Sequence, residues 1–216
     1  MGDCLWGTPG IRALKKSFPG AGIDLLIRPQ WESLYFGNPH IRKVIPYQPQ
    51  WYLQLALLPR LMGIHYDHVL IFHANKDIRR LLPRLRCSKI WAHQNLPNLR
   101  DDQILKFQKA THPILRRDAI LKKLGSESDD VQMEVFLNDK DRAEANSFLK
   151  QNQMKAKEFV YLNIGASLPH KRWPEDRMVS LAKLFLEHTK LGIVLGGGPE
   201  DAAAIEEIEH QLDQER

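Results

Sequence analysis

The chain has 216 residues, of which 43% are hydrophobic and 26% are charged, and its 31 Lys and Arg residues exceed its 26 Asp and Glu residues by five. This composition is typical of globular proteins and excludes disordered, collagen-like and low-complexity chains. Two cysteines are too few for a disulfide framework, which favours a reducing cytoplasm, and no uncharged apolar stretch reaches the ~18 residues of a membrane span.

Short apolar runs alternate with helical patterns along the first two thirds of the chain. Strands that are buried and alternate with amphipathic helices indicate parallel βαβ units, so the expected fold class is α/β. We expect strands at 23–27, 44–47, 69–72 and 89–92, and helices that end near Phe18 or cover 31–36, 51–62, 76–86 and 101–124.

The same alternation starts again after a polar helix at 141–151. We expect strands at 159–164 and 192–195, each followed by a helix that begins at a proline. The domain boundary is placed so that residues 1–152 form a first Rossmann-like domain and residues 153–216 form part of a second. Two strands are fewer than an open sheet commonly has, so the second domain is expected to be incomplete.

The loop 163–174 joins a strand to a helix and has the parts of a phosphate-binding site. Main-chain N–H groups, a hydroxyl and a cation meet there at the positive end of a helix. It is not a Walker loop, because no glycine precedes the lysine and no Ser or Thr follows it. The alternative is a loop with exposed basic residues and a core Trp173. The candidate ligands of the phosphates are Gly165, Ala166, Ser167 and Lys171.

A carboxylate precedes the first helix at Asp3, next to Gly2. Such a residue usually only caps the helix. If a strand precedes it, however, Asp3 lies at the carboxyl end of that strand, where open α/β sheets bind ligands, and can act as a general base toward a hydroxyl. Both interpretations stay open on the residues alone.

Two other strand ends carry polar residues. In the turn 196–201, Glu200 or Asp201 can accept hydrogen bonds from ribose hydroxyls, although a plain tight turn explains the glycines equally well. His73 and Asn75 follow the strand 69–72 at its carboxyl end and are candidates to line the same cleft.

Three other patterns carry less weight. Asp139 and Asp141 have the spacing of a metal–phosphate site, but helix capping explains them, and the histidines lack ligand spacing, so we expect no metal. The apolar residues of 51–57 can form a face for a membrane interface, but core packing is the favoured interpretation. The two cysteines lack a basic partner that would activate a thiol.

Several landmarks follow one another in an order that a known family shares. They are the Gly-Asp-Cys-Leu-Trp-Gly-Thr-Pro segment continued by Ala-Leu at 2–14, Pro-Gly-Ala-Gly-Ile-Asp at 19–24, Asn-Pro-His-Ile at 38–41, Tyr-Asp-His-Val-Leu-Ile at 66–71, the loop 165–174, and Val-Leu-Gly-Gly-Gly-Pro-Glu at 194–200. Together they resemble the ADP-heptose:lipopolysaccharide heptosyltransferases, glycosyltransferase family 9. Landmarks in one order across nearly the whole chain are far more specific than any one of them.

The resemblance implies a GT-B fold, with an acceptor-side first domain and a nucleotide-sugar-binding second domain. It implies that Asp3 deprotonates the acceptor hydroxyl, that Ser167 and Lys171 hold the diphosphate, and that Glu200 binds the ribose. The donor would be ADP-heptose, with no metal required. The acceptor would be the inner core of lipopolysaccharide at the cytoplasmic leaflet, so a cytoplasmic protein in peripheral contact with the inner membrane is expected.

The chain departs from the family pattern at both ends. The family has an apolar strand before Gly-Asp and an Asp-(Ser/Thr)-Gly-x-x-His stretch after the last helix, and neither is found here. We therefore expect a fragment with little or no transfer activity. The rival functions are a GT-B enzyme for another nucleotide sugar and a non-catalytic glycan-binding fragment. Nucleic-acid binding is not expected, because the sequence has no RNP-like motif, zinc finger or concentrated basic stripe.

Overall fold

The structure is a computed structural model that describes residues 2–94, 96, 99–108, 111–127, 130–166 and 168–213. Its contacts divide the chain into two compact units, Met1–Asn138 and Asp139–Arg216. The domain boundary predicted from the sequence lies later, after residue 152, whereas helix α6 (Asp139–Gln151) falls within the second unit.

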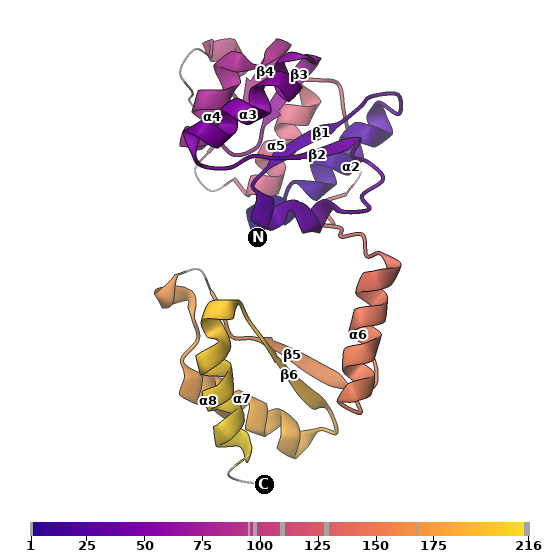
Figure 1. Cartoon of the computed structure of the whole chain (residues 1–216), viewed down its shortest axis with the longest axis vertical. Helices are drawn as coiled ribbons and strands as arrows, with labels where there is room; N and C mark the ends of the chain where they lie inside the picture. The colour runs from indigo at the N-terminus through magenta and orange to yellow at the C-terminus, as the bar shows by residue number, and fades with distance from the viewer. Residues whose placement is uncertain are drawn as a thin grey trace. The chain divides into compact units, whose positions relative to one another are not determined.

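Strands and helices alternate in the first unit, as the sequence predicts (Figure 1). Its elements in chain order are α1 (Gly2–Leu5), α2 (Thr8–Ser17), β1 (Asp24–Ile27), η1 (Pro29–Tyr35), β2 (Lys43–Pro46), α3 (Trp51–Met62), β3 (His65–Ile71), α4 (Lys76–Leu81), η2 (Leu82–Arg84), β4 (Arg86–Ala92), η3 (Asp101–Gln103) and α5 (Pro113–Lys122).

The strands of this unit form two parallel pairs. β1 pairs with β2, and β3 pairs with β4, whose end is continued by a bridge between Ala92 and Ile104. Within the described residues no ladder joins the pairs, but Tyr66 on β3 donates a hydrogen bond to Asp24 on β1.

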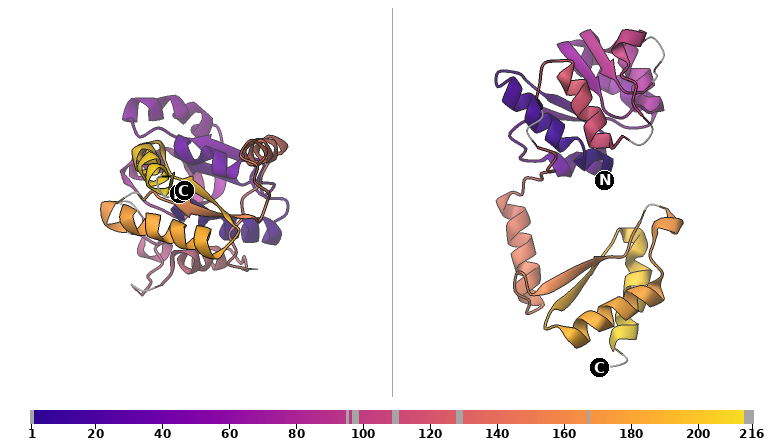
Figure 2. Two further views of the ribbon diagram at one scale, coloured as in Figure 1. Left: turned by 90° about the horizontal axis from the view of Figure 1, so that it is seen from below. Right: turned by 180° about the vertical axis from the view of Figure 1, so that it is seen from behind.

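Helices cover both faces of these strands. Figures 1 and 2 show α3 and α4 on one side and α2 and α5 on the other. The apolar core is correspondingly divided. One cluster joins β2 to α3 and α4 through Ile45, Leu57 and Leu81, and another joins α2 to β1 through Ile11 and Ile27.

The second unit has two parallel strands in its described part, each followed by a helix, which agrees with the expected βα alternation. α7 and α8 bury the apolar side of the strands around Leu162, Val179 and Ile208 (Figure 2). After α6 its elements are β5 (Phe159–Asn163), η4 (Pro169–Lys171), α7 (Glu175–His188), β6 (Gly192–Gly196), η5 (Pro199–Asp201) and α8 (Ala202–Asp213).

Two predicted helices are wrong in extent, although the α/β class is confirmed. The helix predicted for 76–86 ends at Leu81, because Pro83 interrupts it, and β4 already begins at Arg86. The helix predicted for 101–124 begins only at Pro113, because Leu105 donates its backbone N–H to Ala92 and the chain there extends the sheet.

The expected core packing of α3 is also wrong for most of its apolar residues. Leu57 is buried, but Trp51, Tyr52, Leu53 and Leu55 are exposed. Among the described residues no helix is long and apolar enough to span a membrane.

Candidate functional site

The loops that follow β5 and β6 lie at one edge of the second unit. The strands are parallel and in register, with Asn163 opposite Gly196, and Ile164 donates its N–H to the Gly196 carbonyl at 2.8 Å. The two loops that the sequence analysis selects for a nucleotide sugar therefore begin side by side, at the carboxyl ends where open α/β sheets bind ligands.

A buried carboxylate, Asp201, connects these loops. Its side chain is 2% exposed, and Oδ2 accepts the Gly198 N–H at 2.8 Å. Nη2 of Arg172 lies 2.9 Å from Oδ1 in an ion pair, and Nε of Arg172 donates to the Ala166 carbonyl at 3.2 Å. The β6–α8 turn thus holds the β5–α7 loop through one arginine. Sequence reasoning missed Arg172 and offered Asp201 only as a ribose ligand.

Gly165 and Ala166, two of the predicted nucleotide-sugar residues, lie next to this ion pair. Gly165 and Ala166 are half-buried, and a methyl group on Gly165 would overlap the Asp201 carboxylate. Lys171 is exposed at the end of η4, and Glu200 is exposed within η5. Ser167 lies outside the described residues.

The alternative interpretation of this loop combined exposed basic residues, as Lys171 and Arg172 are, with a core Trp173. Trp173 is 45% exposed, so that expectation is wrong. The loop therefore presents an aromatic ring and the cation of Lys171 toward solvent, next to main-chain groups that the Arg172–Asp201 pair holds in place.

In the first unit, Asp3 lies in the single turn α1, whose backbone is fixed from two sides. The Tyr35 hydroxyl donates to the Cys4 carbonyl at 2.6 Å, and the Thr8 hydroxyl donates to the Leu5 carbonyl at 2.9 Å. Asp3 itself is exposed, as is Gly2, and α2 has no side-chain cap at its start. Helix capping of α2 therefore does not explain Asp3.

A buried cation lies near this turn. Arg117 of α5 is 3% exposed, and its guanidinium carbon lies 5.6 Å from the Phe72 ring centroid and 6.0 Å from that of Trp6. Its Nε and Nη1 have no hydrogen-bond partner among the described residues. Burial lowers the pKa of Arg117. The negative charge of Asp3 raises it, and this is the largest of the effects that oppose burial. In the sequence, Arg117 was only one member of a basic pair.

The loop after β3 carries the two predicted acceptor-side residues, and they differ in environment. Asn75 caps α4, because its Oδ1 accepts the N–H groups of Asp77 and Ile78 at 2.9 and 3.0 Å, while its Nδ2 donates to the Tyr47 hydroxyl. These contacts give Asn75 a structural role. His73 is exposed at the same strand end.

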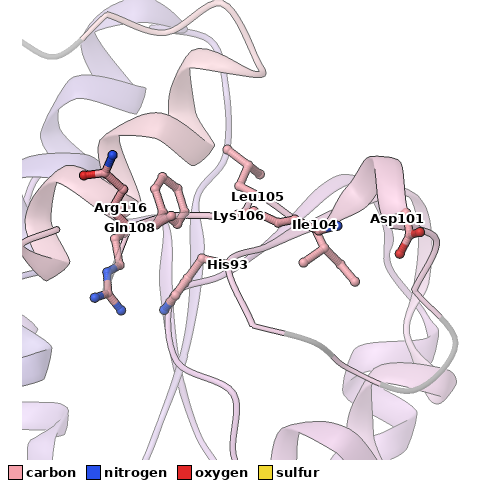
Figure 3. A pocket seen from close by; sticks show the side chains of 8 residues that line it. His93, Asp101, Ile104, Leu105, Lys106, Gln108 and Arg116 are labelled. Atoms are coloured by element: carbon pink, nitrogen blue, oxygen red, sulfur yellow. The ribbon is translucent and has the colours of Figure 1, made fainter. Parts of the chain in front are cut away.

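A cavity of about 470 Å³ opens beside the carboxyl end of β4 (Figure 3). His93 stands at the centre of its lining, with Arg116 on one side and Ile104 and Asp101 on the other. Burial and then the cations of Arg116 and Arg117 lower the pKa of His93, which favours its neutral form. The complete lining is His93, Asp101, Ile104, Leu105, Lys106, Phe107, Gln108 and Arg116.

Three of these side chains can meet an anionic group with N–H donors: Lys106 and Arg116 as cations, and His93 once protonated. The sequence does not indicate this cavity, because its pattern predicts one long helix over 101–124 that includes most of the lining. No three His, Cys, Asp or Glu side chains gather as metal ligands in the part of the chain that the structure describes.

The family model of glycosyltransferase family 9 (heptosyltransferase) matches residues 84–215, which is more than half of the chain. The chain belongs to glycosyltransferase family 9. The match includes both loops of the second unit and the cavity beside β4, and it confirms the resemblance inferred from the motifs.

Solved structures share the fold of this family member. A glycosyl transferase family 9 protein from Veillonella parvula superimposes with a TM-score of 0.82 at 20% identity, over 98% of this chain and 63% of that one. The E. coli heptosyltransferase WaaC with ADP gives 0.72 at 18% identity, over 97% and 69%. E. coli ADP-heptose lps heptosyltransferase II gives 0.70 at 17% identity, over 96% and 65%.

The chain therefore spans only part of the length of these structures, 63% of the Veillonella parvula protein, 69% of WaaC and 65% of heptosyltransferase II. No curated protein matches it by sequence.

Proposed function

We propose that this chain carries the acceptor-side unit and the donor-binding loops of a heptosyltransferase, which transfers heptose from ADP-heptose to the inner core of lipopolysaccharide with inversion. The observation that carries the proposal is the family match over both loops of the second unit, where the Arg172–Asp201 pair holds glycine-bearing main chain beside Lys171. The solved relative WaaC with ADP supports an adenine nucleotide as leaving group.

In the proposed reaction Asp3 is the general base. Its exposed carboxylate takes the proton of an acceptor hydroxyl while that oxygen attacks the anomeric carbon of the heptose. A new carbon–oxygen bond forms as the bond to ADP breaks, on the opposite face of the sugar, and ADP leaves with the electron pair. The rigid backbone of α1 would hold Asp3 in position.

The negative charge on the departing ADP would be stabilised by the cation of Lys171 and by hydrogen bonds from the Ser167 hydroxyl and the main-chain N–H groups of Gly165 and Ala166. Glu200 would accept hydrogen bonds from the ribose. With a lysine and several N–H groups available, we propose that the step requires no metal ion.

On the acceptor side, Gly2, His73 and Asn75 would border the glycan, with Asn75 acting mainly through its cap of α4. The cavity lined by His93, Lys106 and Arg116 supports an anionic acceptor. Because this acceptor is a glycolipid, the chain would work at the cytoplasmic face of the inner membrane, in peripheral contact with it.

The experiment is a binding comparison of ADP-heptose with UDP- and GDP-sugars by calorimetry. We expect ADP-heptose to bind most tightly. Preference for another nucleotide sugar would replace the proposed donor, and acceptor-glycan binding without any nucleotide binding would favour a non-catalytic glycan-binding chain. We expect little or no transfer by these residues alone, and robust turnover would contradict that expectation.

A further inference from the structure

Helix α3 exposes a large apolar surface on the side opposite its buried side. Gln54, Leu57 and Leu61 are 4%, 8% and 2% exposed and face the core. Trp51 and Leu55, by contrast, are 62% and 47% exposed. Tyr52 and Met62 are also about half exposed. Trp51, Leu55 and Met62 follow at intervals of four and seven residues, so they lie along one stripe of the helix.

The composition of α3 is unusual for a surface helix. Apart from Gln54 and Arg60 its twelve residues are all apolar or aromatic. A helix that is apolar all round is normally buried or spans a membrane. Twelve residues rise only about 18 Å, less than the ~30 Å hydrocarbon core of a bilayer, so α3 is too short to span one.

Cations border this apolar stripe. A groove of about 310 Å³ is lined by Trp51, Leu55 and Leu58 of α3 on one side and by Arg80 and Arg84 on the other. Arg84 also donates a hydrogen bond to the Arg80 carbonyl, which holds the two arginines together.

The segment of the chain that forms this groove has a positive net charge. Residues 51–89 include seven Lys or Arg and two Asp, a difference that equals the net charge of +5 of the whole chain. One of the two carboxylates, Asp77, is fully buried in an ion pair with Arg28 at 2.8 Å. The groove beside α3 therefore combines exposed aromatic and aliphatic side chains with the cations of Arg80 and Arg84.

We propose that this α3 face, made of Trp51, Tyr52, Leu55 and Met62 with Arg80 and Arg84 beside them, docks the first unit on an anionic phospholipid bilayer. The apolar stripe enters the boundary between headgroups and acyl chains, and the arginines contact lipid phosphates. The proposal deepens the proposed function and rests on it in one respect, since a lipid-anchored acceptor lies in such a surface. Charge complementarity selects a bilayer over a second copy of this cationic chain.

The test is cosedimentation of the chain with vesicles of phosphatidylcholine alone and of phosphatidylcholine mixed with phosphatidylglycerol. We expect binding to the anionic vesicles that weakens as salt is added. Trp51→Gln with Leu55→Gln lowers the partition coefficient at least about tenfold, because two large apolar side chains leave the bilayer. Arg80→Gln with Arg84→Gln lowers it about tenfold on anionic vesicles and has no effect on neutral ones.

Two matched controls stay at the wild-type level. Leu184→Gln changes an equally exposed leucine of α7, and Arg142→Gln with Lys150→Gln removes two exposed cations of α6. All substituted residues of the α3 test are solvent-exposed, so circular dichroism should show an unchanged fold.

Equal binding to neutral and anionic vesicles, or no binding to either, would overturn the proposal. Self-association of the chain in sedimentation equilibrium that Trp51→Gln with Leu55→Gln abolishes, without change in vesicle binding, would assign the face to a second copy instead. ADP-heptose titration into the unsubstituted chain separates the two proposals. Nucleotide binding without vesicle binding would contradict only the membrane face, and vesicle binding without nucleotide binding would contradict only the proposed donor.

Discussion

Asp201 and Arg172 connect the loops after β5 and β6, although the sequence indicated Asp201 only as a ribose ligand and did not indicate Arg172. The local pattern around Asp201 indicates a turn after a strand, and nothing in it shows that the carboxylate is 2% exposed or that its cation lies in a different loop. Such a pair is visible only when the fold brings two strand ends together. The glycine, lysine and hydroxyl residues of the loop could be predicted as phosphate ligands from the sequence, because that prediction depends only on residues next to one another in the chain.

Replacement of Gly165 by alanine tests this ion pair. The added methyl group overlaps the Asp201 carboxylate and displaces it from Arg172 and the Gly198 N–H. Since this disrupts a buried charge-assisted contact, we expect the free energy of unfolding to fall by about 2 kcal/mol in urea denaturation. Gly20→Ala is the control, because nothing lies within 4 Å of its added methyl group, and an equal effect of both substitutions would contradict the assignment.

His93 makes the first unit sensitive to mild acid. Its pKa is lowered from 6.5, by burial first and then by Arg116, Arg117 and His73, with a backbone hydrogen bond to Ile71 acting in the opposite direction. The unfolded chain therefore binds a proton more readily than the folded chain. The free energy of unfolding is therefore not reduced by His93 above its unfolded pKa, and it falls as the pH drops through 6.5 toward the lower pKa of the folded chain.

Chemical denaturation at pH 7 and pH 5 measures this effect. We expect His93→Gln to lose less stability over that interval than the wild type, while His170→Gln, at an exposed histidine of η4, behaves like the wild type. Equal losses in all three chains would show that His93 does not titrate as inferred.

At the scale of elements, periodicity located most strands and helices but misjudged the extent of two helices and placed the starts of β3 and β4 too late. Pro83 lies inside a basic run that reads as one helix, yet it cannot continue the helix, and β4 begins three residues later. The chain at Ile104 and Leu105 has helix-compatible residues, but its backbone pairs with Ala92. Long-range pairing of this kind overrides local propensity.

The two strand pairs of the first unit are connected through Asp24. Burial opposes its ionisation, but hydrogen bonds from Arg42 and Tyr66 outweigh burial and lower the pKa of Asp24 below 3.8. The ionised Asp24 therefore stabilises the folded chain. This stabilisation is present above the pKa that Asp24 has in the unfolded chain and is lost as the pH falls through its lower pKa in the folded chain.

We expect Asp24→Asn to be less stable than the wild type at pH 7 by about 1 kcal/mol, a modest effect because Arg42 is half exposed. The difference should shrink between pH 5 and pH 3 when both chains are unfolded thermally. The control Asp102→Asn removes the carboxylate of a fully exposed ion pair and should match the wild type throughout. A difference for Asp24→Asn that is constant with pH would contradict the role of its charge.

At the scale of the whole molecule, the order of landmarks was more informative than any single motif. Gly-Asp near residue 2, the 165–174 loop and the glycine turn at 196–198 each fit an ordinary structural explanation, but their common order predicted the family that the match over 84–215 confirms. The α/β class followed from alternation alone. The exposed apolar face of α3 could not be predicted in this way, because the sequence of an apolar helix does not show whether its outer side contacts protein or lipid.

The central claim is that the loops after β5 and β6 bind the diphosphate of an adenine nucleotide through Lys171. It is tested most directly by calorimetric titration of ADP into the unsubstituted chain, into Lys171→Ala and into Lys190→Ala. Lys190 is the control because it is an exposed lysine just before β6, at the end of the strand away from the loop that follows it. We predict that Lys171→Ala weakens binding by more than about 1 kcal/mol, the scale of a charge-assisted contact, and that Lys190→Ala does not. Equal affinities in all three chains, or no binding of ADP by any of them, would contradict the claim.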